Sequence, residues 1–173
     1  MSVNESTERL SPGKKFRLAL ENNKPLQVVG TINAYCAMMA EQLGHQAIYL
    51  SGGGVANASY GLPDLGMTSL NDVIADVQRI TGASSLPLLV DIDTGWGGAF
   101  NIAKTIRDME KAGAAAVHLE DQVAQKRCGH RPNKEVVSTE EMVDRIKAAV
   151  DARIDSDFFI MARTDSFSPE GLE

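Results

Sequence analysis

The chain has 173 residues, of which 43% are hydrophobic and 23% are charged, and its formal net charge is -6. These values suit a globular chain with one domain and an ordinary apolar core. Acidic and basic residues are interspersed, so there is no basic stripe for nucleic acid, and no apolar run approaches the ~20 residues of a transmembrane helix. The first residues also lack the apolar stretch of a secretory signal. We therefore expect a cytoplasmic protein with no nucleic-acid or membrane partner.

Short apolar runs alternate with helical stretches along most of the chain. Residues 1–10 are polar and are expected to form a flexible segment. Strands are predicted over residues 25–30, 46–51, 86–93, 114–121 and 158–165, and helices over 11–22, 33–44, 69–82, 99–113 and 138–153. The strands are continuous apolar runs, which is typical of a parallel sheet covered by helices. This pattern leaves two architectures open, a doubly wound sheet and a (β/α)8 barrel.

Polar residues stand at the carboxyl ends of the predicted strands, and they favour the barrel. In a barrel these ends converge on one mouth, whereas a doubly wound sheet gathers ligand groups near one switch point. A complete barrel typically needs ~250 residues, so we interpret residues 11–173 as the N-terminal part of one (β/α)8 domain, covering about five strands. Ser168, Pro169 and Glu170 resemble the cap and first turn of a further helix. The polar residues at the strand ends are Asn33, Ser51, Asp91, Asp93, His118, Glu120, Asp121, Arg163 and Asp165.

Asp91 and Asp93 are the candidate metal ligands. Residues i and i+2 of a strand point the same way, so the two carboxylates are expected side by side. Such a pair needs a cation, and Mg2+ is commonly held by one or two carboxylates together with waters and substrate oxygens. Glu120, at the end of the fourth strand, is placed to join the outer shell of the metal. The alternative interpretation is an aspartate pair that caps a loop.

The segment around Ser51, Gly52 and Gly53 is a candidate anion site. Glycine backbone N–H groups at a strand end can form a concavity for a carboxylate or phosphate, although a flexible turn is the plainer explanation. Tyr49 lies two residues earlier on the same face. Asp64, between the second strand and its helix, is a candidate acid or base, or an outer-shell metal partner, and otherwise a turn residue.

Two cysteines, Cys36 and Cys128, do not make a disulfide framework. Cys36 lies in an apolar helical stretch and is expected to act as a small hydrophobe. Cys128 follows two cations and precedes His130 by two residues, in the sequence KRCGH, and these groups favour the thiolate. Cys128 is therefore a candidate for proton exchange or nucleophilic attack, and the alternative is an incidental thiol in a basic loop. His118 stands in an apolar strand, and we expect a core role for it.

The sequences SGGG, LPDLG, VDIDTGWGG, HLEDQ, KRCGHRPNKE and MARTD occur together and in this order. In combination they resemble the 2-methylisocitrate lyase family of the isocitrate lyase and phosphoenolpyruvate mutase superfamily, from about residue 11 to residue 173. The resemblance implies a (β/α)8 barrel, Mg2+ as cofactor, a homotetramer, and cleavage of a tricarboxylate, 2-methylisocitrate, to pyruvate and succinate in propionate catabolism (the methylcitrate cycle).

The resemblance also implies roles for individual residues. Cys128 matches the catalytic cysteine, Asp91 and Asp93 match the metal site, and Glu120 matches a supporting position near it. Tyr49 and Asp64 match supporting positions, and they are candidates for removing the proton of the substrate hydroxyl. The implied substrate-binding residues are Ser51, Gly52, Gly53, Lys126, Gly129, His130 and Arg163.

Three other interpretations remain open. Isocitrate lyase performs the same chemistry and gives glyoxylate and succinate, but its loop usually reads KKCGH, so Arg127 favours the methylisocitrate branch. Mutases, decarboxylases and hydrolases of the superfamily generally lack the cysteine loop. The third is a non-catalytic fragment, because family members have further strands that supply more substrate contacts.

Overall fold

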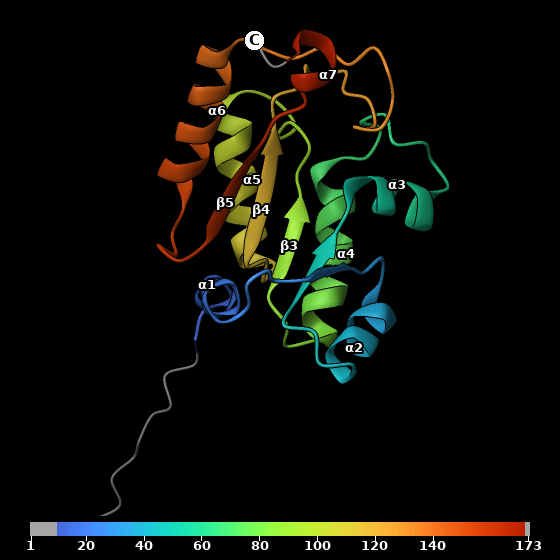
Figure 1. Cartoon of the computed structure of the whole chain (residues 1–173), viewed down its shortest axis with the longest axis vertical. Helices are drawn as coiled ribbons and strands as arrows, with labels where there is room; N and C mark the ends of the chain where they lie inside the picture. The colour runs from blue at the N-terminus through green and yellow to red at the C-terminus, as the bar shows by residue number, and fades with distance from the viewer. Residues whose placement is uncertain (1–9, 172–173) are drawn as a thin grey trace, which may run out of the picture.

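The fold is built on a parallel sheet of five strands. A computed structural model describes residues 10–171, and Figure 1 shows its strands side by side. They lie in the order in which they occur in the chain, and every neighbouring pair is parallel. The strands are β1 (Val28–Gly30), β2 (Ala47–Leu50), β3 (Leu88–Asp91), β4 (Ala116–Glu120) and β5 (Phe159–Arg163).

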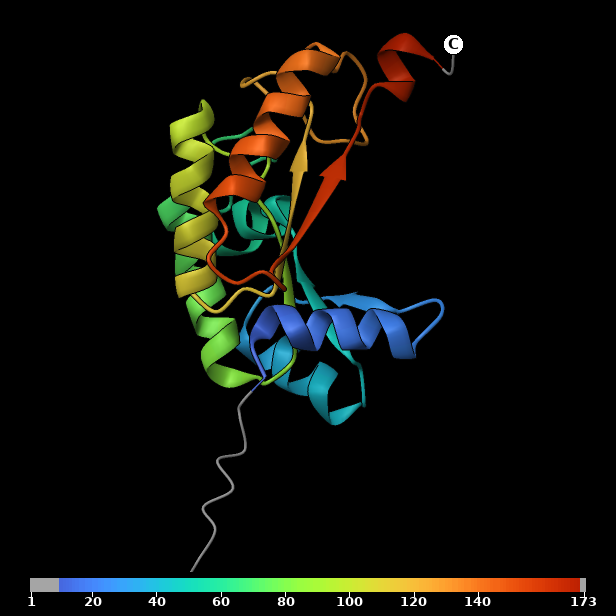
Figure 2. The same cartoon turned by 90° about the vertical axis from the view of Figure 1, so that its left-hand side faces the viewer.

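The helices are distributed unequally over the two faces of the sheet. Five helices contribute to the larger core on one face, whereas α1 crosses the lower part of the opposite face, as Figure 2 shows. The helices are α1 (Pro12–Asn22), α2 (Ala34–Gln42), α3 (Gly52–Tyr60), α4 (Leu70–Ala83), α5 (Ala99–Lys111), α6 (Thr139–Ala152) and α7 (Phe167–Glu170). None of the helices in the described range is long and apolar enough to cross a bilayer.

This topology confirms the barrel-type prediction over the doubly wound alternative. A doubly wound sheet reverses its strand order at a switch point, whereas here the order runs β1-β2-β3-β4-β5 without reversal. A sheet that winds in one direction, with α2, α4, α5 and α6 outside, is the arrangement of a (β/α)8 barrel. The opposite face of the sheet therefore corresponds to a barrel interior, and α1 covers its lower end.

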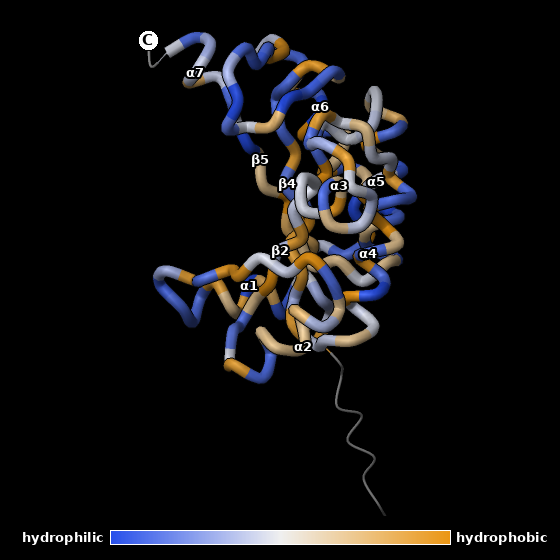
Figure 3. Tube along the Cα trace, turned by 90° about the vertical axis from the view of Figure 1, so that its right-hand side faces the viewer, coloured by the Kyte–Doolittle hydropathy of each residue, from blue (hydrophilic) through white to orange (hydrophobic). Residues whose placement is uncertain are grey.

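The side chains of the strands alternate between two packed layers. Ile48, Leu50 and Val90 face the helices, in a core that α2, α4, α5 and α6 complete. Ala47 and Leu89 face the other way and pack with Phe16 of α1 and its neighbours. Figure 3 shows hydrophobic residues concentrated along the strands, while the loops beyond their upper ends are mostly hydrophilic. The polar residues near the strand ends thus sit on the α1 side, above the small apolar layer.

Several helix boundaries follow the sequence signals. The hydroxyl of Ser11 caps α1, and Ser69 and Asp72 form the expected capping box of α4. Ser138 accepts a hydrogen bond from the backbone N–H of Glu141 at the start of α6. Gly44, with φ of +83°, follows the end of α2 in a conformation that favours glycine.

Two expectations differ from the structure, and a third is not tested by it. The glycines after Ser51 form the first turn of α3, a helix that the sequence did not predict. The short final helix begins at Phe167, with Ser168 inside it, and Ser166 at its N-cap makes no side-chain capping bond. The expected flexible segment, residues 1–10, lies almost entirely outside the described residues.

Candidate active site

The strand-end residues meet on the barrel-interior face of the sheet. Asp91 of β3 is in register with His118 of β4, and Glu120 of β4 is in register with Arg163 of β5. Tyr49 of β2 reaches the same group, since its hydroxyl lies 2.9 Å from Nε2 of His118. Because these positions alternate with core residues along each strand, the pleat of the sheet brings five polar side chains together. The predicted convergence of the strand ends is thus confirmed for β2 to β5.

Asp91 is held in place by three hydrogen-bond donors. Its Oδ2 accepts hydrogen bonds from the backbone N–H of Gly52 at 3.1 Å and from the hydroxyl of Tyr49 at 3.4 Å, and its Oδ1 accepts one from the N–H of Asp93 at 3.1 Å. The family resemblance implies a substrate carboxylate at Gly52, and in this structure the carboxylate that accepts the hydrogen bond from its N–H is that of Asp91. The hydroxyl of Ser51 caps α3 by accepting a hydrogen bond from Gly54.

The glycines of α3 allow the helix to approach the acidic residues closely. A Cβ atom on Gly52 would lie 3.2 Å from Oδ1 of Asp93, and one on Gly53 would lie 3.0 Å from Oδ2 of Asp64. Both contacts are tighter than almost all real Cβ contacts. Small residues are therefore needed here so that α3 can pack directly on the carboxylates, which is a different reason from the expected anion-binding concavity.

Asp93 lies beside Asp91, but not because the two residues alternate along one strand, as the sequence predicted. Strand β3 ends at Asp91, and Asp93 has a φ of +46°, so the two residues do not share a strand. The ammonium of Lys126 binds Asp93 instead, with 2.7 Å between Nζ and Oδ1, and it also lies 2.5 Å from Oδ1 of Asp64. Burial works to lower the pKa of Lys126, but the charges of Asp93 and Asp64 outweigh it and raise this pKa. Lys126, which was expected to bind substrate, therefore bridges two acidic residues here.

Glu120 is fully buried, and neither of its carboxylate oxygens has a hydrogen-bond donor. Nη1 of Arg163 lies 3.1 Å from its Oε2, as an ion pair without hydrogen-bond alignment. Burial raises the pKa of Glu120 to about 8, although the charge of Arg163 opposes the shift. Burial, together with the charge of Asp91, likewise raises the pKa of Asp93 to about 6. The cations around Glu120 and Asp93 are therefore not enough to offset the effect of burial on their pKa values.

These properties fit a magnesium site of the kind that keeps several waters. Both oxygens of Glu120 are buried without hydrogen bonds, and an added cation would offset the burial that raises the pKa values of Glu120 and Asp93. Within residues 10–171, no three metal-ligating side chains converge tightly enough to form a closed metal cage. Mg2+ commonly binds one or two carboxylates and keeps waters for its other positions. Asp91 and Asp93 would hold the ion, and Glu120 would act through water.

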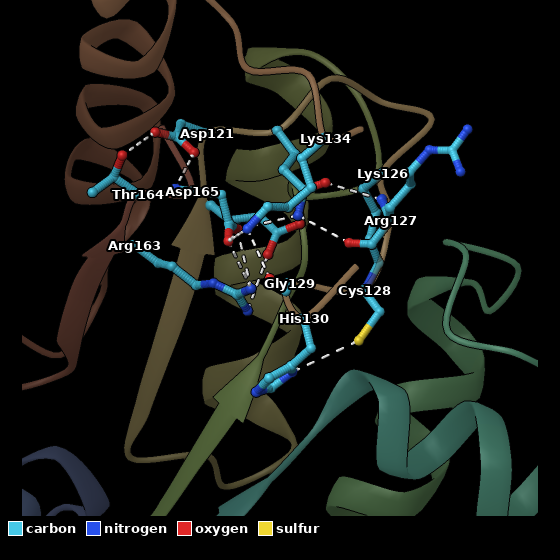
Figure 4. A network of polar contacts seen from close by, with 12 residues as sticks. Asp121, Lys126, Arg127, Cys128, Gly129, His130, Lys134, Arg163, Thr164 and Asp165 are labelled. Carbon is cyan, nitrogen blue, oxygen red and sulfur yellow. Dashed lines mark hydrogen bonds and ion pairs between the residues drawn. The ribbon is translucent and has the colours of Figure 1, made fainter. Parts of the chain in front are cut away.

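The thiol loop, residues 123–137, covers this site. Gly129 packs on the side chain of Arg163 so closely that an added Cβ would lie 2.3 Å from Nη2, and Figure 4 shows the guanidinium of Arg163 beside it. Sγ of Cys128 lies 3.9 Å from Nδ1 of His130. Cys128 and Asp64 also line one cavity of about 550 Å³. The loop of the thiol therefore lies over the same strand ends as the acidic residues.

Sequence reasoning missed several members of this group. His118 was expected in the core, yet it contacts Tyr49 and lies 3.6 Å from Oδ1 of Asp91 through Nδ1. Gln122 contacts the thiol loop directly, and Lys134, within the loop, binds the carbonyl of Gly129. The signal for His118 was its i−2 spacing from Glu120, which places both on one face of the strand.

Comparisons with known proteins agree with this geometry. The family model for phosphoenolpyruvate phosphomutase matches residues 16–172. The chain is 74% identical to 2-methylisocitrate lyase of Vibrio cholerae over 171 residues, covering 99% of this chain and 56% of that protein. A solved structure of oxaloacetate acetylhydrolase with an inhibitor matches with a TM-score of 0.88 and 39% identity, covering 94% of this chain and 56% of that one.

A crystal structure of 2,3-dimethylmalate lyase, described as a member of the PEP mutase/isocitrate lyase superfamily, matches with a TM-score of 0.85 and 39% identity, covering 95% of this chain and 56% of that one. This chain thus spans little more than half the length of the relatives it matches. The matched region contains the five strands and the thiol loop. The chain belongs to the phosphoenolpyruvate phosphomutase family, within the PEP mutase/isocitrate lyase superfamily.

Proposed function

We propose that this chain carries the metal-binding and thiol-bearing part of a Mg2+-dependent carbon–carbon lyase that cleaves 2-methylisocitrate to pyruvate and succinate. One arrangement carries the proposal. The thiol loop closes over Arg163 through Gly129, while Lys126 of the same loop reaches the acidic residues. The 74% identity to a curated 2-methylisocitrate lyase supports this substrate. A cytoplasmic location and a homotetramer are part of the proposal and rest on the family resemblance.

The first chemical step removes the proton of the substrate hydroxyl, and Tyr49 and His118 are arranged to accept it. Burial, followed by the charge of Asp91, raises the pKa of Tyr49, so its phenol keeps its proton at neutral pH. Burial lowers the pKa of His118, so its ring is neutral. As the Tyr49 oxygen takes the substrate proton, its own proton can leave the 3.4 Å hydrogen bond to Asp91 and pass across 2.9 Å to Nε2 of His118. Asp64, the other candidate base, is bound to Lys126 here.

Breaking the carbon–carbon bond then leaves a carbonyl on the pyruvate half and an electron pair on the succinate half. Cys128 is the proposed acid that protonates the departing carbon. Arg163 would bind a substrate carboxylate, once its contacts with Glu120 and Asp165 are shared with the substrate. A bound Mg2+ would supply electrostatic stabilisation of the negative charge on substrate oxygens. Closure of the thiol loop would keep water out of the site during these steps.

The decisive experiment measures pyruvate release from 2-methylisocitrate by the purified chain, with Mg2+ and again with EDTA. Turnover that depends on Mg2+ would support the proposal. Isocitrate is assayed in parallel for glyoxylate release, because isocitrate cleavage is the alternative activity. Circular dichroism must show that the sample is folded. A folded chain that releases neither product would favour the non-catalytic fragment, the alternative to which the 56% coverage points.

A further inference from the structure

Three consecutive backbone carbonyls of the thiol loop each have a hydrogen-bond donor. The carbonyl of Arg127 accepts a hydrogen bond from Nε2 of Gln122 at 3.0 Å, and that of Cys128 accepts one from the N–H of Arg131 at 2.8 Å. The carbonyl of Gly129 accepts one from Nζ of Lys134 at 2.7 Å. The peptide groups on both sides of the thiol are therefore fixed, although the loop has no regular secondary structure of its own.

Gln122 secures the first half of the loop. Its side-chain amide binds Arg127 twice, because Oε1 also accepts a hydrogen bond from the N–H of Arg127 at 2.9 Å. The same Nε2 lies 3.1 Å from Oδ2 of Asp165. Gln122 is only 1% exposed, so water does not compete for these bonds. Its amide therefore binds both the N–H and the carbonyl of Arg127, as the backbone of a neighbouring strand would, and so fixes this part of the loop.

Lys134 secures the second half of the loop and shares its anchor with Gln122. Its Nζ lies 3.0 Å from Oδ1 of Asp165, and the side chains of both residues are less than a tenth exposed. Asp165 is itself held by a hydrogen bond from its N–H to Oδ1 of Asp121, at 2.8 Å. Nη2 of Arg163 lies 3.0 Å from the other oxygen of Asp165. Figure 4 shows this group beneath the loop, between the ends of β4 and β5.

We propose that Lys134 and Gln122 are positioning residues, which hold Cys128 over the site by fixing the peptide groups on both sides of it, with Asp165 at the end of β5 as their common anchor. The proposal rests on the proposed function, in which Cys128 transfers a proton. Asp165 also contacts Arg163, so its carboxylate positions both the thiol loop and the guanidinium that we propose binds substrate. A proton donor must lie within hydrogen-bond reach of the reacting carbon, and a loose loop would not keep it there.

The test substitutes Lys134→Met and, independently, Gln122→Met in the full chain. Two readouts need no turnover: hydrogen exchange of loop peptides within 123–137, and alkylation of Cys128 by iodoacetamide, with Cys36 as the internal reference. Each variant should raise both rates at least about tenfold, because each loses more than one hydrogen bond, and one bond from a charged or fully buried donor already corresponds to about tenfold. Lys147→Met is the matched control, because Lys147 is an exposed lysine on α6 with only a long contact to Asp144. It should leave both rates within about twofold.

Unchanged loop exchange, or a looser loop with unchanged alkylation of Cys128, would overturn the proposal. If Lys134→Met unfolds, alkylation of Cys36 rises equally, and the milder Lys134→Gln takes its place with the same expectations. In the turnover assay, both variants should lower kcat with little change in KM, because positioning acts on the chemical step. If the unsubstituted chain has no turnover, the proposed function fails, while the exchange and alkylation results still decide the roles of Lys134 and Gln122.

Discussion

The ammonium of Lys126 lies 2.7 Å from Oδ1 of Asp93, inside the group of carboxylates that we assign to a metal. Both side chains are less than a tenth exposed. A lysine of the thiol loop thus supplies positive charge to the carboxylates at which we propose that Mg2+ binds. In this proposal, the position of the loop and the occupancy of the metal site are coupled through one ion pair.

Replacing Lys126 by methionine should destabilise the protein and increase its response to Mg2+. Removing one partner from a buried ion pair typically costs ~3–5 kcal/mol, because the remaining charge is left unpaired. Mg2+ would replace part of that charge, so its stabilising effect should be larger in Lys126→Met than in the unsubstituted chain. Thermal unfolding with and without Mg2+ measures both effects. Lys104→Met, on the exposed face of α5, is the control, and an equal Mg2+ response in all three proteins would contradict the expectation.

The raised pKa of Glu120 makes stability depend on pH. Its pKa is about 8 in the folded protein, whereas an unfolded glutamate titrates near 4.5, so between these values the folded state binds more protons. Stability without metal should therefore be greatest at the acidic end of this window and should fall as the pH rises toward 8. The slope from one group is at most ~1.4 kcal/mol per pH unit.

Urea unfolding between pH 5 and pH 8 measures this slope, and Glu120→Gln should flatten it. Glu21→Gln is the matched control, because Glu21 is exposed on α1 and should leave the slope unchanged. Addition of Mg2+ should also flatten the slope, since a nearby cation favours the charged carboxylates. An equal slope in Glu120→Gln and in the unsubstituted metal-free protein would show that Glu120 is already ionised there.

Sequence patterns were sufficient for the sheet and for most helices, because those elements depend on local signals. The apolar runs predicted all five strands, and the capping box at Ser69 and Asp72 predicted the start of α4. Helix α3 was missed because three glycines disfavour a helix by intrinsic propensity. In the structure, the Ser51 cap and the burial of Val55 and Ala56 stabilise it. Tertiary packing thus outweighs local preference at this point.

In the site, too, local sequence signals predict some residues, whereas others depend on tertiary contacts. Asp91, Glu120 and Arg163 could be predicted, because parallel strands bring their carboxyl ends to one edge. The lysines that bind the neighbouring carboxylates could not be predicted, since they come from an irregular loop without periodicity. Lys126 is 62 residues from Asp64 in the chain, and Lys134 is 31 residues from Asp165. No pattern in the sequence specifies such pairs before the path of the loop is known.

A methyl group on Gly129 should lift the thiol loop away from Arg163. The added Cβ would lie 2.3 Å from Nη2, and that guanidinium is held by two carboxylates, those of Glu120 and Asp165, so we expect the loop to shift and to strain its own hydrogen bonds. We expect Gly129→Ala to expose Arg127 and Arg131 to trypsin and to reduce turnover. Gly82→Ala is the control, since no atom lies within 4 Å of the added Cβ, and in helix α4 it should stabilise by ~0.5–1 kcal/mol. Equal trypsin resistance in both variants would show that Arg163 yields instead of the loop.

Replacing Cys128 by serine should separate chemistry from binding. Serine has nearly the shape of cysteine, but its hydroxyl is a far weaker acid, so it would protonate the departing carbon poorly. Turnover of 2-methylisocitrate should fall by ~100-fold or more, as expected for the loss of a general acid. The affinity for Mg2+, measured by calorimetry, should hardly change, because the hydrogen-bond contact of the thiol is with His130 and not with Asp91 or Asp93.

Cys36→Ser provides the matched control for this change. Cys36 lies on α2, which packs on the helix-covered side of the sheet through Ala37 and Ala40, so its loss should leave turnover within about twofold. Near-normal turnover by Cys128→Ser would remove the thiol from the mechanism and leave the thiol loop as a lid only. A joint loss of turnover and Mg2+ binding would instead mean that position 128 supports the fold of the site. Only loss of turnover with Mg2+ affinity retained identifies Cys128 as the proton donor.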